Sequence, residues 1–350
     1  MVEKEDFFKE KESEILAVNC DYLPWEALRK TNILVTGGTG LVGSTLIRVL
    51  LRANETKALG LKLFALVRNI QKAEAMLPSA DALCFVQGEV DPLPEISENI
   101  DYIIHTASPT ASKFFVEHPV ETIKAAVCGT MNILDLAKEK KVKSVVYLSS
   151  MEAYGEIHSE ESLREDACSQ VKSGSVRSCY PQSKLLCENM CVSYYSEYGV
   201  PAKAVRLAQT FGPGVPAEDN RVFAQFARAA IHKNDIVLLT DGSTKQCYLY
   251  TLDAASAILA VLLKGAPGEV FNAANPDTYC SIREMGELVA TQIAGGEISV
   301  IINAGNAEAV GKYPPTHKWN LNVDKLLATG WRPTADLEQM YRQLIRYMTK

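Results

Sequence analysis

The stretch 33-ILVTGGTGLVG-43 joins a short apolar run to a glycine-rich loop and then to a segment with helical spacing. Gly37, Gly40 and Gly43 allow a tight turn, a close approach of backbone N–H groups to a pyrophosphate, and close packing of the helix on the strand. The N-terminus of such a helix also favours an anion. An ordinary glycine-rich turn between a strand and a helix is the alternative. The position of the loop, after the first strand and before an amphipathic segment, favours dinucleotide binding.

Apolar runs of strand length alternate with helical segments through the first two-thirds of the chain. Two intervening segments, 41–54 and 120–141, carry apolar residues at helical spacing, as crossover helices over a parallel sheet do. This alternation predicts an α/β fold with a doubly wound parallel sheet of the Rossmann type. The predicted strands are 33–36, 62–67, 83–88, 101–107, 144–150 and 202–208.

The pattern loosens after residue 211, where clusters of glycine, proline and asparagine become frequent. A further strand at 269–274 is expected to rejoin the main sheet, so that a smaller C-terminal substrate lobe is assembled from separate chain segments. The expected boundaries are 1–30 for a helical N-terminal extension, 31–207 with 247–274 for the Rossmann domain, and 208–246 with 275–350 for the lobe.

Composition excludes several classes of function. The 350 residues carry a net charge of −6, and the positive residues are scattered along the chain. This pattern predicts no basic surface that would bind the phosphate backbone of a nucleic acid. The acidic N-terminal segment does not resemble a signal peptide, and no apolar run is long enough to span a bilayer. Nine dispersed cysteines without metal-ligand spacing predict a reducing cytoplasm and no metal site.

The end of the second predicted strand bears on the choice of dinucleotide. An acidic residue there hydrogen-bonds the ribose 2′-hydroxyl of NAD, whereas an arginine accommodates the 2′-phosphate of NADP. The strand ends in 66-LVRN-69, so Arg68 favours NADP, although a solvated arginine is the plain alternative. The expected cofactor is therefore NAD or NADP, with a preference for NADP.

The segment 179-CYPQSKLLCENMC-191 places Tyr180 and Lys184 one turn apart on one face of a predicted helix. A lysine ammonium in that position favours the tyrosinate electrostatically, so the phenol can act as a base. This spacing alone occurs by chance in many helices. It gains weight from its place downstream of the glycine loop and of 149-SSMEAYG-155, where two hydroxyls and a carboxylate follow the predicted strand 144–150.

Taken together, these motifs resemble the extended short-chain dehydrogenase/reductase family, which comprises nucleotide-sugar epimerases, dehydratases and decarboxylases. Within the family, 104-IHTASPTASKFFVEHPVETIK-124 is most similar to the UDP-glucuronate decarboxylase branch, with the dTDP-glucose 4,6-dehydratases next. The resemblance implies an NAD(P)-binding domain, a lobe for a nucleotide sugar, and a homodimer built from helices such as those at 120–139 and 180–199. Its other motifs are 101-DYIIHTASP-109, 129-GTMNILDLA-137, 205-VRLAQTFGPG-214, 248-YLYTLDAA-255 and 330-GWRP-333.

The resemblance also implies roles for individual residues. Tyr180 would take the proton of the sugar hydroxyl, Lys184 would bind the nicotinamide ribose and lower the tyrosine pKa, and Ser150 would hydrogen-bond the reacting oxygen. Glu152 matches a glutamate that the decarboxylases and dehydratases use after oxidation. The cofactor would further contact Thr39, Leu41, Val42, Glu89, Val90, Thr106, Ala107 and Ser108, and the substrate would contact Pro109, Gln209, Arg221, Lys245 and Gln246.

Several positions depart from the family pattern. The asparagine of the central helix is replaced by Ala126, and the asparagine that contacts the sugar diphosphate by Gln209. The arginine that binds the diphosphate is replaced by Gln246, and a neutral amide cannot replace a bidentate guanidinium. Either Lys245, Arg221 or Arg283 binds the phosphates, or the substrate is not an ordinary nucleoside diphosphate sugar.

Three functions follow as hypotheses. The leading one is an NAD(P)-dependent enzyme that oxidises a nucleotide sugar transiently at C4, with Tyr180 as base, and then epimerises, dehydrates or decarboxylates it. Glu152 favours dehydration or decarboxylation, because those steps need an acid/base beyond the tyrosine. The second is a net NADPH-dependent ketone or sugar reductase of the same family. The third is a non-catalytic dinucleotide-binding sensor or structural subunit, which would not need Ser150, Tyr180 and Lys184.

Overall fold

A seven-stranded sheet, in which every strand runs parallel to its neighbours, forms the centre of the computed structural model. The structure describes residues 2–303 and 316–350, without the side chains of 2–5 and 17–19. The strand order is β10-β6-β5-β4-β1-β2-β3, so the order reverses between β1 and β4. The strands are β1 (Asn32–Thr36), β2 (Lys62–Val67), β3 (Leu83–Gln87), β4 (Tyr102–His105), β5 (Ser144–Ser150), β6 (Ala202–Leu207) and β10 (Val270–Ala273).

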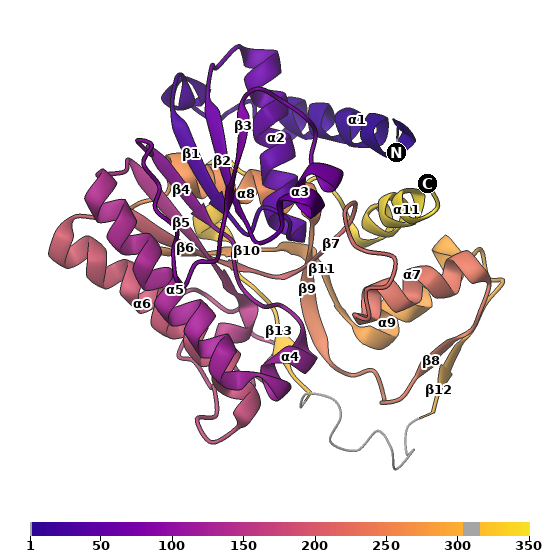
Figure 1. Ribbon diagram of the computed structural model, residues 1–350. Coiled ribbons are helices and arrows are strands. Elements are labelled where there is room, and N and C mark those ends of the chain that lie inside the picture. The colour runs from indigo at the N-terminus through magenta and orange to yellow at the C-terminus, as the bar shows by residue number, and fades with distance from the viewer. Residues whose placement is uncertain (1, 304–315) are drawn as a thin grey trace.

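Helices cover both faces of this sheet (Figure 1). On one face, α2 (Leu41–Lys57) packs against α8 (Thr251–Lys264), and α1 (Val2–Asn19) lies on both of them. On the other face, α5 (Pro119–Lys140) and α6 (Cys179–Tyr198) lie side by side. The prediction of a doubly wound parallel sheet is confirmed.

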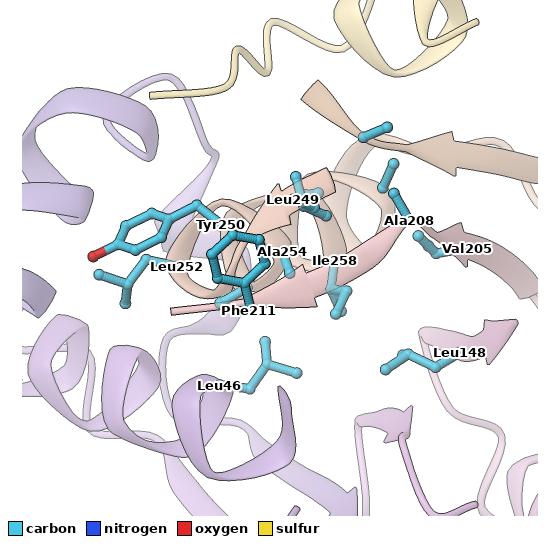
Figure 2. Packing of buried hydrophobic residues seen from close by; sticks show 14 of the residues in the cluster. Leu46, Leu148, Val205, Ala208, Phe211, Leu249, Tyr250, Leu252, Ala254 and Ile258 are labelled. Carbon is cyan, nitrogen blue, oxygen red and sulfur yellow. The ribbon is translucent and has the colours of Figure 1, made fainter. Parts of the chain in front are cut away.

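The side chains of a single strand alternate between two apolar cores, as the pleat of a strand requires. Ile33 and Val35 of β1 belong to the core under α2 and α8, whereas Leu34 belongs to the core under α5 and α6. Figure 2 shows the first core, in which Leu46 of α2 and Ile258 of α8 lie among strand residues. Burial on both faces explains why these strands read as continuous apolar runs.

A second, smaller sheet stands beside the carboxyl ends of the main strands (Figure 1). Its central strand β9 (Lys245–Tyr250) pairs with β7 (Gln209–Phe211), β11 (Asn275–Ser281) and β13 (Lys318–Trp319). A separate parallel pair is formed by β8 (Ile236–Leu238) and β12 (Val300–Ile302). The helices of this region are α7 (Val222–His232), α9 (Ile282–Leu288), the π-helical turn η4 (Val289–Ile293) and α11 (Leu337–Met348), whereas α10 (Asp324–Leu327) lies against β10 and α8 of the main unit.

Short helices complete the main unit, and three of them bring residues to the ends of its strands. These are α4 (Ser112–Glu117) after β4, η2 (Met151–Tyr154) after β5, and η3 (Val176–Ser178) directly before α6. The others are η1 (Trp25–Leu28) and α3 (Ile70–Met76). The strand expected at 269–274 does join the main sheet, next to β6. The division of the chain into domains at 30, 207, 246 and 274 stays a prediction.

Candidate active site

The glycine loop lies between the end of β1 and the start of α2 at Leu41. Gly37 has a φ of 67°, and a Cβ there would lie 2.9 Å from Ala107 Cα. A Cβ on Gly43 would lie 2.3 Å from Gly37 O. Thr106, which follows β4, donates from Oγ1 to Thr36 O at 2.6 Å. The loop, the N-terminus of α2 and the end of β4 are therefore in close contact, where the strand order reverses, which is where such sheets bind dinucleotides.

The other residues predicted to contact the cofactor follow the carboxyl ends of β1 to β4. Arg68 is exposed directly after β2, Glu89 is exposed near the end of β3, and Val90 packs against Gly129 of α5. These positions follow the carboxyl ends of neighbouring strands, which is the edge at which open α/β sheets bind their ligands. The loop and first helical turn contribute Thr39, Leu41 and Val42, and the segment after β4 contributes Ser108.

The structure brings the four residues predicted to be catalytic to the carboxyl end of β5. Ser150 is the last residue of β5, and its Oγ accepts the backbone N–H of Glu152 at 3.2 Å. On α6, the Lys184 Nζ donates to Leu148 O at 2.7 Å and lies 5.5 Å from the centroid of the Tyr180 ring. The expected one-turn separation of Tyr180 and Lys184 is present, because both lie on α6.

Tyr180 is buried, with its ring stacked on Phe115 of α4 at 4.2 Å between centroids. Burial, and next the negative charge of Glu152, raise the pKa of the Tyr180 phenol, while a hydrogen bond with Ser150 and the charge of Arg177 lower it by less. Burial lowers the pKa of Lys184 to about 8. With its pKa raised in this way, Tyr180 is a protonated phenol near neutral pH.

Arg177 was not singled out by the sequence, yet it forms an ion pair with Glu152, one of these four residues. Its Nη1 is 2.7 Å from Glu152 Oε2, and its Nη2 donates to Glu152 Oε1 at 3.1 Å. Its position three residues before Tyr180 was the available signal, because residues at that spacing lie on one side of a helical turn. A pattern of residue types alone does not reveal that its partner is Glu152.

The two serines of 149-SSMEAYG-155 face different surroundings. Ser149 donates to the Glu188 carboxylate, which is buried and bound by the Arg206 guanidinium at 2.7 and 2.9 Å. Ser150 points to the group that contains Glu152 and Tyr180. Tyr154 is fully buried, with its hydroxyl 2.8 Å from Asn272 Oδ1.

The cationic residues predicted to bind the substrate are held by carboxylates. Arg221 Nη2 lies 2.6 Å from Asp219, Lys245 Nζ lies 3.8 Å from Glu160, and Arg283 Nε lies 2.9 Å from Glu287.

Two of the three neutral residues predicted to bind the substrate lie in the small sheet, and the third follows a strand of the main sheet. Gln246 is buried in β9, with its Oε1 3.5 Å from His317 Nε2. Gln209 begins β7 beside β9, and Pro109 lies after β4. None of the three places a positive charge at the position of the missing arginine.

The sequence profile of the NAD dependent epimerase/dehydratase family matches residues 33–274, which is more than half of the chain. The chain belongs to this family. Its matched region begins in β1 and ends after β10, so it contains the glycine loop, Ser150, Glu152, Tyr180 and Lys184.

Relatives of this epimerase/dehydratase include sugar-nucleotide enzymes. UDP-glucuronic acid decarboxylase 1 of Xenopus tropicalis is 28% identical over 325 residues, covering 92% of this chain and 73% of the relative. UDP-glucuronic acid decarboxylase 6 of Arabidopsis thaliana is 26% identical over 311 residues, covering 88% and 85%. These relatives and the family profile identify an NAD-dependent enzyme of the epimerase/dehydratase type.

Solved structures of similar fold come from the same kind of enzyme. UDP-glucose 4-epimerase of Thermotoga maritima superimposes with a TM-score of 0.75 at 20% identity, covering 91% of this chain and 98% of its own. A dTDP-glucose 4,6-dehydratase of Streptomyces venezuelae, solved with NAD bound, gives a TM-score of 0.75 at 22% identity, covering 91% and 97%. At these identities the likeness establishes the shared fold.

The described part of this epimerase/dehydratase holds neither a cluster of metal ligands nor a membrane-spanning helix. Across residues 2–303 and 316–350, three or more histidine, cysteine or acidic side chains nowhere gather as metal ligands. No helix in that same part of the chain has the length and apolarity to cross a bilayer.

His105 is buried between Thr36 and Thr130, and burial lowers its pKa to about 3.

Proposed function

We propose that this enzyme modifies a nucleotide sugar through transient oxidation at C4. The observation that carries the proposal is the convergence of Ser150, Glu152, Tyr180 and Lys184 at the carboxyl end of β5. The relatives named UDP-glucuronic acid decarboxylase support a nucleotide-sugar substrate, and a decarboxylation in particular.

Tyr180 is the proposed base, which takes the proton of the C4 hydroxyl while Ser150 hydrogen-bonds the same oxygen. Lys184 lies beside Tyr180, where its positive charge favours the tyrosinate and its ammonium can hold the nicotinamide ribose. Bound NAD or NADP would supply a hydride acceptor that later returns the hydride. Glu152 would then exchange a proton with the oxidised sugar, which favours dehydration or decarboxylation over epimerisation.

The proposed cofactor site follows the carboxyl ends of β1 to β4, from the glycine loop to Arg68 after β2. Exposure of Arg68 supports the preference for NADP over NAD, because an arginine at this point accommodates a 2′-phosphate. The cytoplasm remains the expected location.

A homodimer through α5 and α6 is the proposed assembly. Both helices expose large apolar side chains, which is the pattern of a surface that another protein covers. These side chains include Ile123 and Met131 of α5 and Leu186 and Val192 of α6.

The proposed substrate contacts are Pro109, Gln209, Arg221, Lys245 and Gln246. Lys245 is the cation most available for phosphate, because its ion pair with Glu160 is the longest of the three, at 3.8 Å. A diphosphate would compete with Glu160 for this ammonium.

The test begins with native mass spectrometry of the purified protein, which should reveal retained NAD or NADP. A thermal-shift screen of UDP-, dTDP-, CDP- and GDP-sugars then identifies the nucleotide, because a ligand that binds the native state raises the melting temperature. With the stabilising sugar nucleotide, Tyr180→Phe should lose turnover by about a hundredfold or more. Full turnover of Tyr180→Phe would overturn the mechanism.

A second candidate is a net NADPH-dependent reductase acting on a ketone or sugar. The exposed Arg68 at the end of β2 and the neutral Gln246 in place of a diphosphate-binding arginine favour it. Stoichiometric consumption of NADPH would identify the reductase, whereas the first mechanism returns its cofactor unchanged in every turnover.

A further inference from the structure

The ion pair between Glu152 and Arg177 joins the two elements that carry the proposed catalytic residues. Glu152 lies in η2, directly after β5 and Ser150, and Arg177 lies in η3, directly before α6 and Tyr180. Both carboxylate oxygens are engaged, at 2.7 and 3.1 Å. The side chains are 22% and 25% exposed, so the pair is largely shielded from solvent. A two-point arginine–carboxylate contact fixes the orientation of the carboxylate as well as its position.

Arg177 also contacts α4, the short helix that covers Tyr180. Its Nη2 donates weakly to Ser112 Oγ at 3.4 Å, and its guanidinium carbon lies 5.4 Å from the centroid of the Phe115 ring. The same ring stacks on Tyr180. Arg177 therefore lies against η2 and α4 at once, and its position depends on the packing around Tyr180.

Opposite charges face the Tyr180 phenol from this pair. Glu152 raises the pKa of Tyr180 and Arg177 lowers it, so the two effects oppose each other. The titratable and charged groups around Tyr180 are Glu152 of η2, Arg177 of η3, Tyr147 of β5, and Cys179 and Lys184 of α6.

We propose that Arg177 is a positioning residue that holds the Glu152 carboxylate beside Tyr180, so that a fixed pair of opposite charges faces the phenol instead of a lone anion. Arg177 acts through Glu152, and the inference rests on the proposed function, in which Tyr180 is the base and Glu152 serves after oxidation. Loss of the arginine charge would leave Glu152 to oppose formation of the tyrosinate. Loss of the bidentate geometry alone would leave the charge in place and free the carboxylate to turn.

The experiment follows the oxidation step by itself, as the absorbance of reduced nicotinamide after the cofactor-loaded enzyme is mixed with the stabilising sugar nucleotide. The rate should rise with pH as Tyr180 deprotonates. In Arg177→Gln this rise should move to higher pH by about one unit, which is about a tenfold slower oxidation at a fixed pH on the rising limb. In Glu152→Gln it should move to lower pH, because the charge of Arg177 is then unopposed.

The conservative variant separates charge from geometry. In Arg177→Lys the oxidation rate should rise with pH over nearly the same range as in the unmodified enzyme. The step after oxidation should slow, so that the reduced cofactor accumulates. Arg342→Gln is the matched control, since Arg342 forms an arginine–glutamate pair with Glu338 on the exposed face of α11, at 2.7 Å. It should leave both steps unchanged.

Opposite shifts in Arg177→Gln and Glu152→Gln support the proposal. If Arg177→Gln folds and retains its cofactor but its oxidation rate rises over the same pH range as in the unmodified enzyme, the proposal is overturned and the proposed function stays intact. If Arg177→Gln does not fold, the proposal is equally overturned by a Glu152→Gln variant whose oxidation rate rises over the same pH range or a higher one. If the unmodified enzyme forms no reduced cofactor with any stabilising sugar nucleotide, the proposed function and this inference fail together.

Discussion

Replacing Arg206 by methionine would leave a buried carboxylate without its counterion. Arg206 lies on β6 and Glu188 on α6, and both are almost fully buried. The guanidinium binds the carboxylate at two points, donates to Glu165 O at 3.2 Å and lies 4.6 Å from the centroid of the Tyr154 ring. In Arg206→Met, the hydroxyl of Ser149 would be the one remaining donor among these contacts.

The expected loss is about 3–5 kcal/mol in the free energy of unfolding, the usual cost of breaking a buried ion pair by removing one partner. With an unfolding entropy of about 2.1 cal/mol/K per residue, the 350 residues give about 0.7 kcal/mol/K. The melting temperature should therefore fall by about 4–7 °C. The loss should be smaller at acidic pH, where the abandoned carboxylate can take up a proton instead of remaining charged.

Urea unfolding followed by tryptophan fluorescence, at about pH 5 and about pH 8, measures both effects. The matched control is Glu188→Leu with Arg206→Met, which removes both charges and should recover most of the lost stability. A single variant within about 1 kcal/mol of the unmodified protein at the higher pH would refute the reasoning. So would a double variant as unstable as the single one.

Three further outcomes are expected. Burial lowers the pKa of His105 from its ordinary 6.5 to about 3 in the folded state. The stability that the neutral ring contributes is therefore complete above pH 6.5 and is lost as the pH falls below that value, by about 1.4 kcal/mol per pH unit. In an NMR titration the ring should stay neutral at a pH where exposed histidines protonate. In Gly43→Ala the added Cβ would lie 2.3 Å from Gly37 O, so α2 would have to move away from the glycine loop. We expect NAD binding, measured by calorimetry, to weaken by roughly tenfold or more. Asp253→Asn should cost about 2–3 kcal/mol in urea unfolding, because the buried carboxylate accepts from Thr334 at 2.6 and 2.8 Å.

Most strands of the main sheet were readable from the sequence because they are covered on both faces, whereas the edge strand β3 is only partly covered. All of β2 except Lys62 is buried, and β4 is buried throughout, so the two strands appear as apolar runs that are interrupted at Lys62 and at His105 alone. The glycine loop was readable for a different reason, since a φ of 67° at Gly37 and the tight approach at Gly43 both require glycine.

The small sheet was not predicted, because its strands lack that signature. β7 and β13 are three and two residues long, and β11 mixes polar with apolar residues. Short strands carry too few residues for a periodic pattern to emerge.

The candidate active site could be predicted only in part. Ser150, Glu152, Tyr180 and Lys184 follow a recognisable order along the chain, and the structure brings them to one place. The partner of Glu152 is a tertiary contact between segments 25 residues apart, and no local pattern specifies it. The same holds for Phe115, whose stacking on Tyr180 depends on how α4 packs against α6.

The path of the chain between the two sheets makes them depend on one another for folding. After β6 the chain enters the small sheet with β7 and β9, returns to the main unit with α8 and β10, and leaves again with β11. A protein cut after Leu207 would lack α8 and would present β6 as a bare sheet edge, which invites pairing with another chain. Synthesis from the N-terminus must therefore extend to Ala273, at the end of β10, before the main sheet is complete, and until then the edge of β6 stays open to pairing with another chain.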